Sequence, residues 1–121
     1  MMTYDEMKYA LSLVENPVEK LEMVMDFGKN LLPVPDSAEC TEISGCASFV
    51  KICRHNGNFY GFADSAMVRG IVAIFLAMVD KKSVKEIKKI DFAGEFKSLN
   101  LNFGVSRLNG IQSMIIFFQN L

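Results

Sequence analysis

The apolar stretch from Met67 to Val79 constrains the fold of this 121-residue chain more than any other feature. A helix formed by this stretch would have almost no polar face, so other elements have to cover it on most sides. Asp64 and Ser65 lie directly before the stretch, and both residue types cap helix N-termini. Gly70 costs about 1 kcal/mol relative to alanine inside a helix, which predicts that another backbone packs closely against it. We therefore predict a central, buried helix.

Two helices are predicted before this central helix. Thr3 and Glu6 have the spacing of a capping box, and the first helix is expected to end near Glu15. Asn16 is a suitable cap for the second helix, which is expected to reach Pro33. Each helix carries an apolar stripe that indicates a core-facing side. The stripes consist of Met7, Ala10, Leu11 and Val14 in the first helix and of Val18, Leu21, Val24, Met25 and Leu32 in the second.

Two further helices are predicted after the central one. Ser83 and Glu86 form a capping box for a short helix, and Ser106 is expected to cap the last helix. Residues 92–102 between them show no clear pattern. The apolar stripe of the last helix consists of Leu108, Ile111, Met114, Ile115 and Phe118.

A β-hairpin is predicted in the middle of the chain. Residues 47–54 roughly alternate in polarity, Asn56-Gly57 is a strong two-residue turn signal, and residues 58–63 return as the second strand. Because a two-stranded hairpin is marginal by itself, we expect a third strand, from the region of Ile43 or from residues 99–103. The order of elements predicts an α+β fold of two layers, with helices packed on one face of a small antiparallel sheet. The length suits a single domain over residues 1–121.

Charge and hydropathy exclude several classes of protein. A formal net charge of -1 provides no basic field for a phosphate backbone, so nucleic-acid binding is not expected. The longest apolar run, residues 70–79, is shorter than the roughly 18 residues of a membrane-spanning helix. Residues 1–6 lack the basic and apolar regions of a signal peptide. We therefore expect a cytoplasmic protein that does not enter a membrane.

The chain has three cysteines: Cys40, Cys46 and Cys53. Thiols stay reduced in the cytoplasm, so no disulfide framework is expected. Their wide spacing, without a Cys-x-x-Cys pair, also argues against a metal site, although His55 lies close to Cys53. Cys53 is interpreted as a packing residue within a strand and His55 as a solvated residue at its end. Cys40 is interpreted as an exposed loop residue without an assigned role.

Cys46 has the most informative surroundings. Residues 33–45 form an unusually long predicted loop, and long loops in compact domains tend to carry function. Gly45 permits a sharp backbone turn, and Cys46 then opens an apolar run that is typical of a strand. This placement suits a nucleophile that has to reach a partner's active site, and it equally suits an inert core cysteine.

Three motifs in this order resemble the SufE family of sulfur-acceptor proteins. They are Ser44-Gly45-Cys46-Ala47-Ser48-x-Val50, then Ala63-Asp64-Ser65-Ala66-Met67-Val68-Arg69-Gly70, then Ser106-Arg107-Leu108-Asn109-Gly110-x-x-x-Met114. The segment 16–33 is similar to the family's helix that ends in Leu-Gly-Lys-x-Leu-Pro. The resemblance implies the α+β fold shared with IscU-type scaffolds.

The resemblance also implies a chemistry. Cys46 matches the family's acceptor cysteine, which takes persulfide sulfur from a SufS-type cysteine desulfurase and relays it to a scaffold such as SufBCD. The desulfurase uses pyridoxal phosphate, and the acceptor needs no cofactor or metal of its own. The thiol is expected to rest in an apolar pocket and to swing out on docking, with residues 33–45 as the mobile element.

The resemblance assigns supporting roles to three further residues. Asp64 and Arg107 match family positions near the acceptor loop or the desulfurase interface, and Gly45 provides the turn before the nucleophile. A helix cap for Asp64 and a solvated surface position for Arg107 remain as alternatives. The chain departs from the family pattern at Ala47, where glutamine is common, at Arg69, where lysine is usual, and at Gly104-Val105, where Thr-Pro is usual.

Two other functions stay open. An IscU-like scaffold would hold iron or zinc through Cys40, Cys46, Cys53 and His55. A pure interaction module would stimulate a desulfurase without accepting sulfur. The protein is expected to be a monomer or a homodimer.

Overall fold

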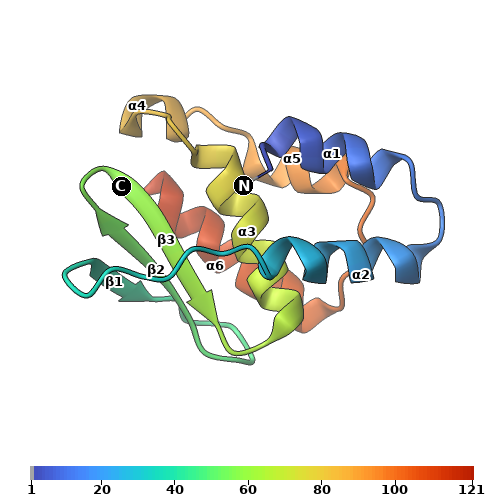
Figure 1. The fold of residues 1–121 in the computed structure, drawn as a ribbon, viewed down its shortest axis with the longest axis horizontal. Coiled ribbons are helices and arrows are strands. Elements are labelled where there is room, and N and C mark those ends of the chain that lie inside the picture. Colours follow the sequence, from blue (N-terminus) through green and yellow to red (C-terminus); the bar gives the residue numbers. More distant parts are fainter. Residues whose placement is uncertain (1) are drawn as a thin grey trace.

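A computed structural model describes residues 2–121, and Figure 1 shows their arrangement. Met1, which belongs to the segment considered for a signal peptide, lies outside the described residues. The helices are α1 (Tyr4–Ser12), α2 (Pro17–Gly28), α3 (Ala66–Val79), α4 (Val84–Ile87), α5 (Phe92–Ser98) and α6 (Val105–Gln119). The strands are β1 (Glu39–Glu42), β2 (Val50–His55) and β3 (Asn58–Ala63). The predicted α+β class is confirmed.

The strands form a three-stranded antiparallel sheet in the order β1-β2-β3. The predicted hairpin is present as β2 and β3, with Val50 opposite Ala63 and His55 opposite Asn58. Its turn, Asn56-Gly57, has φ values of 50° and 78°, a left-handed conformation that these two residue types tolerate best.

The third strand lies within the stretch that the sequence marks as a loop. β1 occupies residues 39–42, just before Ile43, while residues 99–103 form no strand. All four residues of β1 are exposed, so this strand has no apolar alternation by which the sequence would reveal it. Its position follows instead from backbone pairing with β2, from Glu39 opposite Arg54 to Glu42 opposite Lys51.

The helix α3 is the centre of the molecule, as predicted. A Cβ on Gly70 would overlap the carbonyl oxygen of Val24 in α2, and a Cβ on Gly28 would come within 2.6 Å of the Gly70 nitrogen. The two helices therefore cross with their backbones in contact. On the side of α3 that faces the sheet, a Cβ on Gly61 of β3 would overlap the side chain of Val72. The strand β3 therefore also packs closely against α3.

The helices α3 and α6 pack on the same face of the sheet. Phe59 and Gly61 are two residues apart on β3 and therefore point to one face. Phe59 packs edge-on against Phe118 of α6 with ring centroids 5.4 Å apart, while Gly61 contacts α3. Phe118 also lies 5.6 Å from the Phe75 ring of α3, which joins both helices in one aromatic core.

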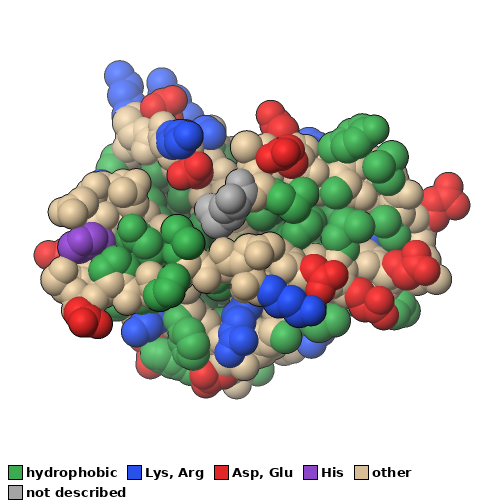
Figure 2. Space-filling view, viewed as in Figure 1, with side chains coloured by type: hydrophobic (Ala, Val, Ile, Leu, Met, Phe, Trp, Pro, Cys, Tyr) green, Lys and Arg blue, Asp and Glu red, His purple; other side chains and the backbone are tan. Residues whose placement is uncertain are grey.

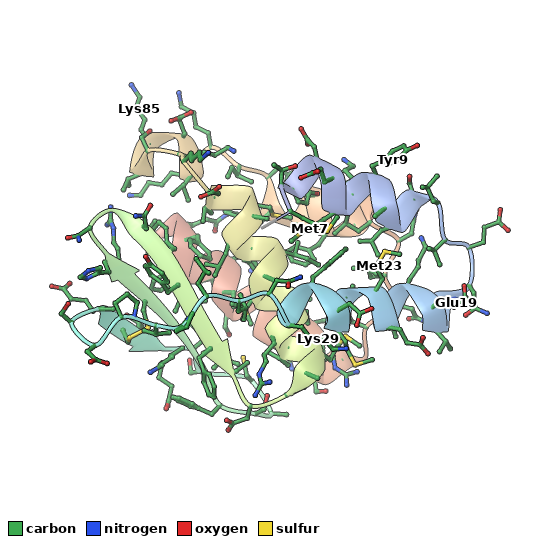
Figure 3. All side chains as sticks on the ribbon, in the orientation of Figure 1. Met7, Tyr9, Glu19, Met23, Lys29 and Lys85 are labelled. Carbon is green, nitrogen blue, oxygen red and sulfur yellow. A yellow bond between two sulfur atoms is a disulfide. The ribbon has the colours of Figure 1, made fainter. Side chains whose placement is uncertain are left out.

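The remaining helices extend this core away from the sheet. In Figure 3 the side chains of Met7 and Met23 lie between α1 and α2, whereas Tyr9 and Lys85 point outward.

Most predicted caps are present: capping boxes of Thr3 with Glu6 and of Ser83 with Glu86, and N-caps Asn16 and Ser65. The expected ends of the first two helices were too late, because α1 ends at Ser12 and α2 at Gly28.

Charged side chains of both signs are mixed over the face in Figure 2, with Lys and Arg gathered around α4. No helix in residues 2–121 has the length and hydropathy needed to cross a membrane.

Candidate functional site

Cys46 lies in the short loop that joins β1 to β2, directly after the turn at Ser44-Gly45. Both ends of this loop are held by backbone hydrogen bonds. The Ile43 N–H donates to the Val50 carbonyl at 2.9 Å, and the Asp64 N–H donates to the Phe49 carbonyl at 3.1 Å. Gly45 has a φ of 82°, a conformation that other residue types adopt only with strain. The sheet thus fixes the base of the loop, and Gly45 turns the chain so that Cys46 faces α6.

Two glycines bring the loop into close contact with α6. A Cβ on Gly110 of α6 would lie 2.9 Å from the Cys46 Sγ atom, and a Cβ on Gly45 would lie 2.9 Å from the Ser113 Oγ atom. The Ser113 hydroxyl in turn donates to the Asn109 carbonyl at 3.1 Å. The thiol therefore rests against bare helix backbone at Gly110.

A cavity of about 240 Å³ opens beside the thiol. The loop, the N-terminal half of α3 and the N-terminal half of α6 form its walls. The lining residues are Cys46, Ala47, Ser48, Ser65, Val68, Ile71, Ser106, Arg107, Gly110 and Met114. Cys46 is partly buried, and this burial raises the pKa of its thiol above the ordinary value of 9.0. The cavity therefore favours the protonated, weakly nucleophilic form of the thiol.

Arg107 is the cationic residue of this lining, and it comes from the first turn of α6. The predicted cap of this helix was wrong: the N-cap is Gly104, without a side-chain hydrogen bond, and Ser106 lies inside the first turn. Val105 and Leu108 of the same helical turn are 76% and 51% exposed, so Leu108 does not belong to the buried stripe. The first turn of α6 therefore presents an exposed cation from the cavity lining and two exposed apolar side chains, a combination that is typical of protein-binding surfaces.

Asp64 contributes to the site through its backbone N–H and not through its side chain. Its N–H holds the end of the Cys46 loop, while its exposed carboxylate is not part of the cavity lining. The side chain that caps α3 is Ser65, whose hydroxyl accepts from the Val68 N–H at 3.4 Å.

The other two cysteines correct an expectation. Cys40 of β1 and Cys53 of β2 form a disulfide, whereas the sequence predicted free thiols. They occupy directly opposite positions in the register, with Cα atoms 4.0 Å apart. The expectation of free thiols came from the assumed reducing compartment, and because β1 was not recognised as a strand, the sequence did not place the two cysteines opposite each other. Cys46 is the free cysteine of the described chain.

The disulfide also bears on the metal-scaffold alternative. The sulfur atoms of Cys40 and Cys53 are bonded to each other and so are not available as ligands in this state. His55 contacts Ser37 and Asn56. Within residues 2–121 no three His, Cys, Asp or Glu side chains gather as a potential metal site.

Gly110 is the site residue whose role the sequence did not reveal. The signal was present, because a glycine inside a helix indicates close packing, as it does at Gly70. The sequence could not show that the atom packed against it is the Cys46 sulfur.

Comparison with known proteins agrees with the motifs around Cys46. The model of the SufE domain, described as an Fe-S metabolism associated domain, matches residues 5–121. The chain belongs to the SufE family. This confirms the resemblance inferred from the three sequence motifs.

Several SufE-family relatives cover most of the chain. An uncharacterized SufE-like protein of Rhizobium meliloti (strain 1021) is 32% identical over 127 residues, covering 95% of this chain and 91% of the relative. The sulfur acceptor protein CsdE of Escherichia coli (strain K12) is 29% identical over 105 residues, covering 79% and 71%. The cysteine desulfuration protein SufE of Wigglesworthia glossinidia brevipalpis is 28% identical over 117 residues, covering 89% and 81%.

A solved structure has the same fold as this SufE-family chain. The solution structure of a hypothetical protein from Thermus thermophilus superimposes with a TM-score of 0.73 at 16% identity. The match covers 98% of this chain and 94% of that protein.

Proposed function

We propose that this SufE-family protein accepts sulfur on Cys46 from a cysteine desulfurase and relays it to an iron–sulfur cluster scaffold. The observation that carries the proposal is the free Cys46 thiol, held at the tip of an anchored loop beside a cavity. Relatives named as a sulfur acceptor and as a cysteine desulfuration protein support it. The donor is a SufS-type enzyme that uses pyridoxal phosphate, and the scaffold is of the SufBCD type.

The transfer step is a thiol exchange. Cys46 loses its proton and attacks the terminal sulfur of the persulfide on the desulfurase cysteine. A new bond forms between the Cys46 sulfur and that terminal sulfur, and the sulfur–sulfur bond of the donor breaks. The donor cysteine leaves as a thiolate, and Cys46 carries the persulfide. The step needs no external oxidant and no cofactor on this chain.

The environment of Cys46 makes the step depend on docking. Burial raises the pKa of the thiol in the free protein, so little thiolate is present near neutral pH. Movement of the loop out of the cavity restores hydration and lowers the pKa. Because Ile43 and Phe49 are anchored, we place this movement in residues 44–48, a shorter segment than the 33–45 loop expected from the sequence.

Arg107 and Asp64 are assigned supporting roles. The Arg107 side chain at the cavity mouth contacts the desulfurase, together with the exposed residues Val105 and Leu108. Asp64 supports the loop through its backbone bond to Phe49. We place the reaction in the cytoplasm. There the Cys40–Cys53 pair is expected to exchange between disulfide and dithiol.

The test is intact-mass spectrometry after incubation with a desulfurase, pyridoxal phosphate and cysteine. Wild type and the control Cys40→Ser should gain one or more sulfur atoms that a reductant removes, and Cys46→Ser should gain none. Addition of sulfur to Cys46→Ser would overturn the assignment of the carrier. If Cys46→Ser still stimulates the desulfurase fully, the protein acts as a binding regulator instead.

A further inference from the structure

We propose that Gly110 is a positioning residue that keeps the Cys46 thiol retracted in its cavity. Its consequence for sulfur transfer rests on the proposed function, whereas its effect on the thiol can be measured on this protein alone. Gly110 is buried within α6, and it packs against the loop between β1 and β2.

The space in front of Gly110 is occupied by Cys46. A Cβ built on Gly110 has as its three nearest neighbours the Sγ atom of Cys46 at 2.9 Å, its Cβ at 3.7 Å and its Cα at 3.9 Å. The last two distances are ordinary van der Waals contacts, so the sulfur is the one of these atoms that a methyl group would displace. Glycine destabilises a helix interior relative to alanine. At this position its lack of a side chain leaves room for the thiol.

The two glycines at the crossing of α2 with α3, Gly28 and Gly70, behave differently. A Cβ on Gly70 or Gly28 meets backbone atoms of the crossing helix, which cannot move without separating α2 from α3. At Gly110 the obstructing atom is the end of a side chain on a loop, and it can leave by rotation about the Cα–Cβ bond of Cys46. Gly70 therefore determines how the helices pack, and Gly110 determines where the thiol points.

A methyl group at Gly110 should move the thiol from the cavity toward solvent. The thiol would then lose the desolvation that raises its pKa, and its thiolate fraction near neutral pH would increase. In the sulfur-transfer reaction, such a variant would depend less on the partner to expose Cys46.

The first test is the rate of Cys46 alkylation by iodoacetamide as a function of pH, in protein whose Cys40–Cys53 disulfide is intact. Gly110→Ala should react several-fold faster than wild type near neutral pH, and the midpoint of its pH profile should shift downward. The matched control is Gly104→Ala, because a Cβ at this exposed N-cap of α6 meets nothing within 4 Å. Gly104→Ala should react like wild type. An unchanged rate and pH profile in Gly110→Ala would overturn the proposal.

A second test separates thiol position from a general packing defect. In a Cys46→Ala background the sulfur is absent, so Gly110→Ala should raise the unfolding temperature, as expected for a glycine replaced inside a helix. In the wild-type background the rise should be smaller. An equal fall in both backgrounds would show that Gly110 serves packing alone and would overturn the proposal. Neither test uses a desulfurase, so a failure of sulfur transfer and a failure of this inference can be told apart.

Discussion

Cys40 on β1 and Cys53 on β2 are joined by a disulfide that brackets Cys46, the residue at the tip of the intervening loop. The strand β1 is an exposed edge strand, held by its backbone pairing with β2 and by this bond. The same pair of strands that carries the loop of the proposed nucleophile is thus joined by a covalent link, one residue pair from the end of the ladder that lies away from the loop.

Reduction of this disulfide should destabilise the protein. The bond joins two residues that are 13 positions apart in the sequence. Closing a loop of that size stabilises the folded state by about 2 to 4 kcal/mol. Urea unfolding of wild type with and without reductant should show this loss as a lower midpoint. The control is Cys40→Ser, which has no bond to reduce and should give the same midpoint under both conditions. Equal midpoints for oxidised and reduced wild type would contradict the prediction.

Gly70→Ala should weaken the packing of α2 on α3. The added Cβ overlaps the Val24 carbonyl, a backbone atom that cannot rotate away, and such overpacking costs about 1 to 3 kcal/mol of unfolding free energy. Denaturant unfolding measures this cost. Gly104→Ala is the comparison, because its Cβ points into open space, and its cost should stay below that of Gly70→Ala, at no more than about 1 kcal/mol from the weaker N-cap. Similar effects of both substitutions would argue against the close helix crossing.

Arg107→Ala should weaken the productive encounter with the desulfurase while leaving the fold intact. An exposed charge contributes up to about 1 kcal/mol, so the concentration of this protein that half-saturates the desulfurase should rise roughly two- to fivefold. Titration of desulfurase activity measures the change. Lys85→Ala is a suitable control, since Lys85 is exposed on α4 and points away from the body of the molecule (Figure 3). Unchanged sulfur transfer by Arg107→Ala would exclude the docking role.

Glu95 should make stability depend on pH in the acid range. The Tyr4 hydroxyl donates to its carboxylate at 2.6 Å and Lys8 lies at 3.3 Å, and these contacts lower the pKa of Glu95 below the ordinary value of 4.5. Because the folded-state pKa is lowered, this stabilisation is present above the unfolded value and is lost as the pH falls through the folded value.

The measurement for Glu95 is the unfolding temperature between neutral pH and about pH 3. Glu95→Gln should be less stable than wild type at neutral pH, and its difference from wild type should shrink toward acid. A constant difference over this range would show that the carboxylate charge has no part in the contact between α1 and α5.

Features set by neighbouring residues could be predicted from the sequence. The capping boxes at Thr3 and Ser83 and the Asn56-Gly57 turn depend on contacts within a few residues. The central position of α3 follows from its apolar surface, and the contact at Gly70 follows from the cost of glycine in a helix. Cys46 and its family resemblance were equally visible, because they lie in short motifs.

Tertiary structure alone decided how distant residues meet. An exposed strand such as β1 is held by backbone hydrogen bonds that any side chain allows, so its residues show no alternation of polarity. Without this strand, the sequence did not reveal that Cys40 and Cys53 lie opposite each other. The contact of Gly110 with the Cys46 sulfur likewise depends on how α6 packs against the loop. The sequence by itself determined the hairpin, most of the helices and the nucleophile of the proposed reaction. The packing of α6 against the loop decided that this thiol lies inward and partly buried with a raised pKa, because desolvation depends on the neighbours that the fold brings together.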